Sequence, residues 1–89
     1  MSAQLTAQDH PGTVLMHHYL IPNNLTIYRV AKDTGIDKKA MTRVLCGRES
    51  LPVKEAVLLA RYFGEADDFF ASLQLRHDLC REQERLTSR

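Results

Sequence analysis

The helix-breaking residues of this chain recur at short intervals and divide it into short segments. They are Pro11-Gly12, Pro22-Asn23-Asn24, Gly35, Gly47, Pro52 and Gly64. Between these breakers, apolar residues recur at spacings of three and four, the period of an amphipathic helix, and do not alternate as in a strand. The sequence therefore predicts an all-α protein, and its 89 residues predict one domain with one core.

Five helices are predicted from the apolar spacing and from capping residues at the segment ends. Their expected ranges are Gly12 to Leu20, Ile27 to Thr34, Lys38 to Cys46, Val53 to Phe63, and about Ala66 to Arg81 or beyond. We expect the fourth helix to bury Val53, Ala56, Val57, Ala60 and Phe63. Residues 1-9 are predicted to be a flexible N-terminal segment, 10-82 the folded domain and 83-89 a flexible tail.

The segment from the second helix to the third carries the signals of a helix-turn-helix. Thr26 is a suitable N-cap for the second helix, and Asp37 can cap the third. Gly35 fits the left-handed position that follows a helix. The turn is then only about three residues long, short enough to hold two helices at a steep angle. The sequence therefore predicts a five-helix bundle that contains a helix-turn-helix.

The third predicted helix begins with positive charge, where a helix disfavours it. The N-terminus of a helix is electropositive, so Lys38 and Lys39 each cost ~0.3–1 kcal/mol there. Residues 26 to 48 hold six Lys or Arg against two Asp, although the net charge of the whole chain is only +1. This arrangement favours an anionic partner. In a helix-turn-helix the second helix enters the major groove of DNA with its N-terminal residues nearest the bases.

Seven residues are predicted to contact DNA. Lys38 and Lys39 would approach a phosphate or a guanine edge, while Thr42 would touch a thymine methyl and Arg43 would bridge a guanine. The other three, Thr26, Arg29 and Arg48, are better placed for backbone phosphates. The alternative is a helical domain whose lysines only keep it soluble, since many helical bundles contain tight turns with glycine.

No pattern for catalysis or metal binding is found in the sequence. Spacing supports no Ser-His-Asp or Cys-His arrangement, phosphate-binding glycine loop or carboxylate pair, so we expect no enzymatic activity and no cofactor. Cys46 and Cys80 lie far apart without spaced histidine partners, so neither a disulfide framework nor a zinc site is predicted. The four histidines, His10, His17, His18 and His77, are expected at the surface or at caps. Without a secretory signal or a long apolar run, the chain is expected to be cytoplasmic and not to contact a membrane.

The fifth predicted helix has two apolar faces. Phe69, Phe70 and Leu73 share one face, while Leu75, Leu79 and Leu86 share another. Two apolar faces need two partners. We expect one face to pack on the core and the other on a second subunit.

Four segments resemble, in order, those of the HigA-like antitoxins, also called VapI-like, which are Xre-type helix-turn-helix proteins. They are HPGTVL at 10 to 15, LTIYRVAKDTGIDKKAMTRVLCGRESL at 25 to 51, EAVLLARYFG at 55 to 64 and FFASLQLRHDL at 69 to 79. The combination of HPG, ARxFG and LQxRxDL makes this resemblance more specific than the helix-turn-helix pattern alone.

The resemblance implies a lambda-repressor-like DNA-binding domain that forms a homodimer and binds a palindromic operator in its own promoter. It further implies the antitoxin of a type II toxin-antitoxin pair, which neutralises a RelE/HigB-like, mRNA-cleaving toxin and represses its own transcription. Lys38 to Cys46 would be the recognition helix. Helix five would be the dimerisation element, for which we single out Phe70, Leu75 and Leu79.

The chain departs from the family pattern at Ile27, where members often have a polar residue such as Gln that contacts phosphate. One alternative is therefore a protein-interaction module whose DNA binding has decayed, which the near-neutral net charge also favours. Another is a stand-alone Xre-type transcriptional regulator without a toxin. A toxin-like reading frame beside the gene would distinguish these alternatives.

Overall fold

The computed structural model describes residues 10–87, which form helices and turns and no strand. The elements are α1 (Pro11–Leu15), the π-helical η1 (Met16–Leu20), α2 (Ile27–Thr34), α3 (Lys38–Leu45), α4 (Val53–Phe63) and α5 (Phe69–Thr87). Because α1 runs directly into η1, the described residues form five helical segments, as predicted. The predicted flexible segment 1–9 lies outside the described residues. No helix within 10–87 has the length and apolar character needed to cross a bilayer.

The helical ends agree with the predictions closely for α2 and α4 and less well for the first helix. The first helix begins at Pro11, one residue earlier than predicted, because a first-turn proline loses no helical hydrogen bond. Its second half widens into a π-helix, in which the N–H of Ile21 donates to the carbonyl of Met16 at 3.0 Å. In the third helix Cys46 is the C-cap and not the last helical residue.

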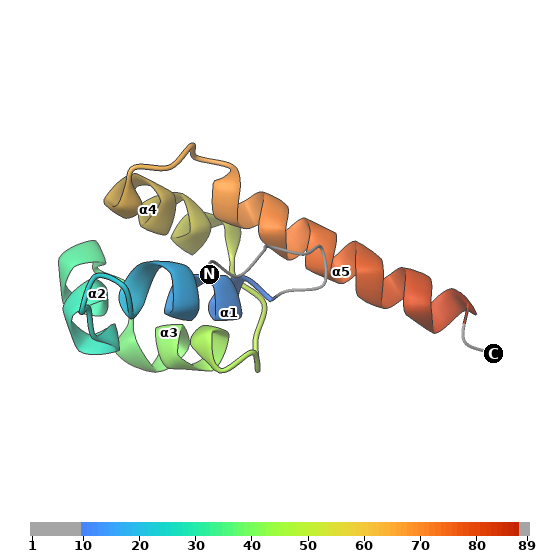
Figure 1. Ribbon diagram of the computed structural model, residues 1–89, viewed down its shortest axis with the longest axis horizontal. Coiled ribbons are helices and arrows are strands. Elements are labelled where there is room, and N and C mark those ends of the chain that lie inside the picture. The colour runs from blue at the N-terminus through green and yellow to red at the C-terminus, as the bar shows by residue number, and fades with distance from the viewer. Residues whose placement is uncertain (1–9, 88–89) are drawn as a thin grey trace.

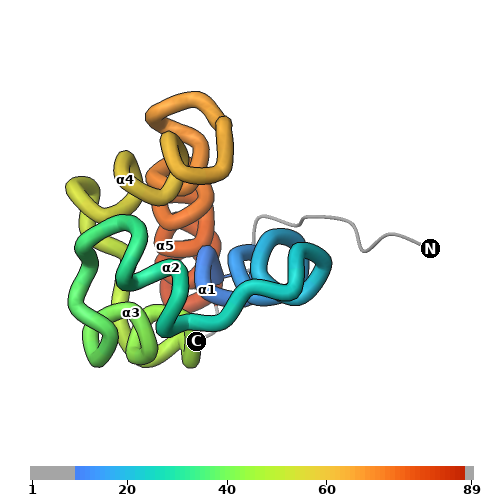
Figure 2. The backbone as a smooth tube through the Cα atoms, turned by 90° about the vertical axis from the view of Figure 1, so that its left-hand side faces the viewer, coloured from blue at the N-terminus to red at the C-terminus, as the bar shows by residue number. Residues whose placement is uncertain are grey.

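The helices form two groups in space (Figures 1 and 2). α3 packs against α2 and α1, while α5 packs against α4 and α1. The second half of α5 extends away from the rest of the molecule (Figure 1). The helix-turn-helix therefore lies on the body of the molecule, and the end of α5 projects from it.

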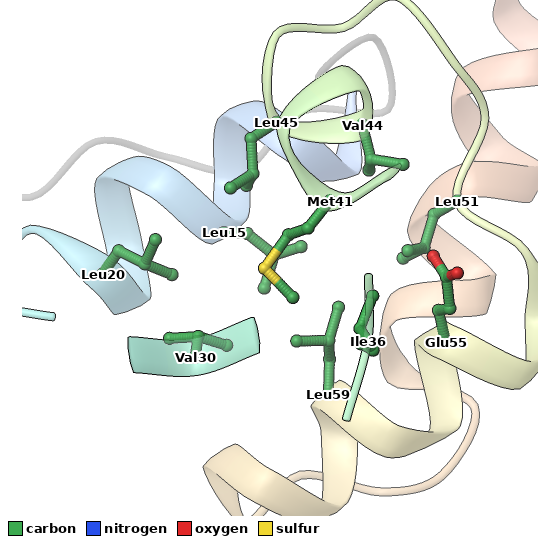
Figure 3. A pocket seen from close by; sticks show the side chains of 10 residues that line it. All are labelled: Leu15, Leu20, Val30, Ile36, Met41, Val44, Leu45, Leu51, Glu55 and Leu59. Atoms are coloured by element: carbon green, nitrogen blue, oxygen red, sulfur yellow. The ribbon is translucent and has the colours of Figure 1, made fainter. Parts of the chain in front are cut away.

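The core is apolar and closely filled. In Figure 3 the side chain of Met41, from α3, points among Leu15, Leu59 and Ile36, which come from three other parts of the chain. The space that remains between these residues is about 10 Å³, too small to hold a ligand. This interior therefore supports the helices and is not a binding pocket.

The HPG motif brings α1 against α3. His10 is the N-cap of α1, and its Nδ1 accepts a hydrogen bond from the N–H of Gly12 at 2.9 Å. A Cβ atom on Gly12 would lie 2.1 Å from the carbonyl oxygen of Val44 in α3, far inside contact distance. Only glycine allows the two helices to approach this closely.

The predicted buried face of α4 is confirmed in part: Ala56 and Ala60 are buried, as expected, and Val57 and Phe63 are half-buried. Val53, predicted to be buried, is 69% exposed, whereas Leu59, which was not predicted, is 2% exposed. The buried residues of the helix are Ala56, Leu59 and Ala60. They show that the stripe facing the core is rotated toward Leu59, which leaves Val53 in the first turn uncovered.

The bounds of α5 also differ from the prediction. The helix begins only at Phe69, and Asp67 lies in the turn before it, where its carboxylate accepts two hydrogen bonds from Arg61 at 3.0 Å. At the other end the helix continues to Thr87. The predicted flexible tail is therefore helical over residues 83–87, and residues 88–89 lie outside the described part of the chain.

Phe70, which we predicted to be a dimerisation residue, is a core residue. Its exposed fraction is 0%. Its ring lies 5.3 Å from that of Tyr19 and 6.4 Å from that of Phe63, measured between ring centroids. Phe70 thus has no surface left for a second subunit, because helices that precede it in the chain already cover it.

Candidate nucleic-acid interface

Local hydrogen bonds hold the α2–turn–α3 unit in the predicted form. The hydroxyl of Thr26 accepts from the N–H of Arg29, and the carboxylate of Asp37 accepts from the N–H of Ala40, both at 3.0 Å. Gly35 has a φ of 80°, and its N–H donates to the carbonyl of Ala31 at 2.9 Å. The predicted caps and the three-residue turn are thus confirmed, and together they fix where α3 begins.

The outer face of α3 carries the cationic residues. Met41, Val44 and Leu45 are buried, so the helix presents its other side to solvent. On that side Lys38, Lys39 and Arg43 are exposed and Thr42 is half-buried. The hydroxyl of Thr42 donates to the carbonyl of Lys38 at 2.8 Å, one turn earlier in the same helix. This hydrogen bond orients the Thr42 side chain on the helix surface.

The two lysines at the start of α3 differ in their surroundings. The ammonium of Lys38 lies 5.9 Å from the centre of the Tyr28 ring, within the range of a cation–π interaction. This contact joins the start of α3 to the start of α2. Lys39 makes no ion pair with any residue between 10 and 87. Of the two lysines, Lys39 is therefore the one less engaged by the rest of the protein.

The end of α3 is covered by the loop that follows it. Gly47 takes a left-handed φ of 75°, and the N–H of Arg48 donates back to the carbonyl of Arg43 at 2.9 Å. The loop then brings Glu49 beside α3, where its Oε2 accepts from Nε of Arg43 at 2.5 Å. Arg43 and Arg48 therefore lie near each other at the C-terminal end of this face.

Arg29 is held on α2. Its Nε donates to Oδ2 of Asp33 at 2.9 Å, and the same oxygen accepts from the hydroxyl of Tyr62 in α4 at 2.7 Å. The hydroxyl of Tyr62 and the guanidinium of Arg29 lower the pKa of Asp33 below its usual range. In the described part of the chain, no hydrogen bond or ion pair joins Thr26 or Arg29 to α3. The positive charge of Arg29 is therefore partly neutralised within the protein, unlike that of Lys39.

His10 links the start of α1 to the loop after α3. Its Nε2 donates to the carbonyl of Glu49 at 3.0 Å, while its Nδ1 accepts from Gly12. This pattern requires the neutral imidazole, since a protonated Nδ1 cannot accept a hydrogen bond. Burial lowers the pKa of His10, as does the nearby ring of His77, whose centroid lies 5.0 Å away. The prediction of His10 as a cap is confirmed, but its link to Glu49 was not predicted.

Two curated proteins are similar to the chain in sequence, and no family model matches it. Virulence-associated protein I of Dichelobacter nodosus is 27% identical over 70 residues, which cover 79% of this chain and 65% of that protein. The uncharacterized HTH-type transcriptional regulator YbaQ of Escherichia coli is 29% identical over 69 residues, which cover 78% of this chain and 61% of that protein. The chain thus matches less than two thirds of the length of these relatives.

A solved structure shares the arrangement of the helices. It is that of the Pseudomonas aeruginosa antitoxin HigA with the higBA promoter, which superposes with a TM-score of 0.83 over 88% of this chain and 85% of that chain. The chain is similar in sequence to Virulence-associated protein I and in fold to the antitoxin HigA, and both similarities fit the predicted helix-turn-helix pattern. The sequence identity between this chain and the solved antitoxin is 19%, so the likeness shows a shared fold.

Sequence reasoning missed one buried polar residue that shapes the surface around α3. Gln74 of α5 accepts from the N–H of Leu51 at 2.8 Å and donates to Asp78 at 2.9 Å. It therefore fixes the loop after α3 against α5. A signal was available, because Gln74 lies four residues after Phe70 and next to Leu73, at the spacing of a core position.

Proposed function

We propose that the chain is a DNA-binding transcriptional regulator whose helix α3 reads a palindromic operator in its own promoter. The observation that carries this proposal is the outer face of α3, where Lys38, Lys39 and Arg43 are exposed directly after a capped, three-residue turn. Thr42 lies on the same face, while Thr26, Arg29 and Arg48 are the proposed phosphate contacts. The likeness to regulators and to a promoter-bound antitoxin supports it.

The effect of the cationic residues on DNA binding tests this proposal. Lys39→Ala and Arg43→Ala should each weaken binding to the chain's own promoter fragment by about 5-fold to 150-fold, since a good base contact contributes ~1–3 kcal/mol. Loss of one phosphate contact should also flatten the dependence of log affinity on log salt by about 1. Titrations at several salt concentrations measure both quantities.

Arg76→Ala is the matched control, because Arg76 is an exposed cation on α5 and not on α3. It should bind the promoter fragment as the wild type does. Unchanged binding in both α3 variants would contradict the proposal and favour the interaction module without DNA binding.

The proposed regulator is a homodimer that pairs through α5. Leu75 and Leu79 are 59% and 51% exposed, and Leu86 lies on the same side of the helix at 59%. An apolar stripe on a projecting helix is a common site of protein association. Pairing about a two-fold axis would place two copies of α3 on half-sites ~34–36 Å apart.

Substitution at this stripe tests the dimer. Leu75→Ser together with Leu79→Ser should reduce the sedimentation mass from two chains to one without unfolding the protein, because neither leucine is in the core. Glu84→Ser, on the opposite side of the same helix, is the control and should leave the mass unchanged. A wild-type chain that sediments as a monomer at micromolar concentration would refute the dimer.

We further propose a more specific role: this regulator is an antitoxin that neutralises a RelE/HigB-like, mRNA-cleaving toxin in the cytoplasm. The likeness of its fold to the antitoxin HigA supports this role. Co-expression with the neighbouring reading frame should yield a stable complex with a small basic protein, and it should restore the growth that this partner arrests when it is expressed alone. If no such partner exists, the stand-alone regulator is the remaining interpretation.

A further inference from the structure

We propose that Glu49 is the positioning residue for Arg43: it holds the guanidinium through Nε so that the other two nitrogens can read a single guanine. This inference rests on the proposed DNA binding by α3. Nε of Arg43 donates to Oε2 of Glu49, which lies six residues later in the chain, at 2.5 Å.

The chemistry of arginine explains why this contact matters for reading a base. Recognition of guanine requires two adjacent donors that face its O6 and N7 together. Glu49 engages Nε, and the two terminal nitrogens of Arg43 make no hydrogen bond to any residue from 10 to 87. These two nitrogens form such a donor pair. An arginine that is already held also loses less rotamer freedom when it binds a base.

The backbone around Glu49 is anchored on both sides, which distinguishes it from an ordinary surface acid. Before it, the N–H of Arg48 donates to the carbonyl of Arg43 at 2.9 Å. At Glu49 itself, the carbonyl accepts from Nε2 of His10 at 3.0 Å. After it, the N–H of Leu51 donates to the buried Gln74 at 2.8 Å. Contacts from α1, α3 and α5 thus direct the Glu49 carboxylate to Arg43.

Removing the charge of Glu49 should have two opposite effects on DNA binding. A carboxylate near DNA repels phosphates, so its removal should strengthen binding to any duplex, which is mainly electrostatic. The same removal should weaken discrimination between sequences, because Arg43 loses its support. Folding should be little affected, since the side chains of both partners are 47% exposed and exposed ion pairs contribute little to stability.

The experiment compares two duplexes of equal length, the chain's own promoter fragment and a random sequence, at one salt concentration. Glu49→Gln should bind the random duplex about 2-fold more tightly, while its preference for the promoter falls about 10-fold. Glu49→Asp keeps the charge but shortens the reach. It should therefore bind the random duplex as the wild type does and still lose preference.

Two further variants complete the test. In an Arg43→Ala background, Glu49→Gln should leave the remaining preference unchanged, because the residue that it supports is absent. Asp67→Asn removes the same charge before α5, where Asp67 pairs with Arg61 far from the leucine stripe, and should not change the preference. Thermal unfolding of every variant confirms that the chain remains folded.

Four outcomes would overturn the inference. Equal strengthening of both complexes by Glu49→Gln would make Glu49 only a repelling charge. The same loss of preference with and without Arg43 would mean that Glu49 acts elsewhere. If the wild type prefers its promoter and the Glu49 variants retain this preference, the positioning role is refuted but the proposed DNA binding is not. A wild type without any preference for its promoter would refute the proposed function and this inference with it.

Discussion

Phe70→Ala is expected to destabilise the folded chain by about 4 kcal/mol, because a large side chain is lost from the core. The Phe70 side chain is fully buried, and its ring packs edge-on against Phe69 at 5.0 Å and against Tyr19 at 5.3 Å. Removing the ring leaves a cavity between α5 and the first helix that these neighbours cannot fill. Urea denaturation followed by circular dichroism measures the free energy of unfolding, and the melting temperature should fall by about 15 °C or more.

Two controls sharpen this prediction. Phe70→Leu keeps most of the volume and should cost about 1.5 kcal/mol. Leu79→Ala removes an exposed leucine of the same helix and should change stability by only about 0.5 kcal/mol at concentrations where the chain is monomeric. Equal effects of Phe70→Ala and Leu79→Ala would contradict the assignment of Phe70 to the core.

Gly12→Ala should cost about 3 kcal/mol, because overpacking against a backbone cannot be relieved by a side-chain rotation. The added Cβ would lie 2.1 Å from the carbonyl oxygen of Val44 and 2.9 Å from Cα of Leu45, so α1 would have to move away from α3. The free energy of unfolding from chemical denaturation again measures the effect.

Gly47→Ala is the matched control for backbone conformation. Gly47 has a φ of 75°, but an added Cβ there would meet nothing within 4 Å. Its cost should be only that of a left-handed backbone, about 1–2 kcal/mol. If Gly12→Ala were no worse than Gly47→Ala, the close approach of α1 to α3 would be wrong.

The helix-turn-helix could be predicted closely because its signals are local. Thr26, Gly35 and Asp37 act through hydrogen bonds to residues three or four positions away. Such bonds depend on residue type and spacing alone. The bounds of α2 and the start of α3 were therefore predicted to the residue.

The apolar faces of α4 and α5 were harder to predict. Apolar spacing shows that a helix has a buried side but not how far that side extends or what covers it. Val53 shares the pattern of the core residues and is exposed, whereas Leu59 is buried. In α5, two apolar faces were visible in the sequence, yet only packing against the first helix and α4 assigns Phe70 to the core and leaves Leu79 outside.

Among the proposed DNA-contact residues, too, some features follow from local sequence and others depend on tertiary packing. The exposure of Lys38, Lys39 and Arg43 follows from helical periodicity once Met41 and Val44 are assigned to the core. The contact between Arg43 and Glu49 could not be predicted in this way, because it depends on how the loop after α3 is held.

By itself, the sequence determined the all-α class, the turn at Gly35 and the cationic outer face of α3, because backbone propensity and capping act over a few residues. Only the tertiary structure decided that α1 lies against α3 at Gly12 and that Phe70 is a core residue. It also decided that His10 holds the loop at Glu49, 39 residues away. Contacts between such distant residues depend on the packing of the whole chain, and no local pattern specifies them.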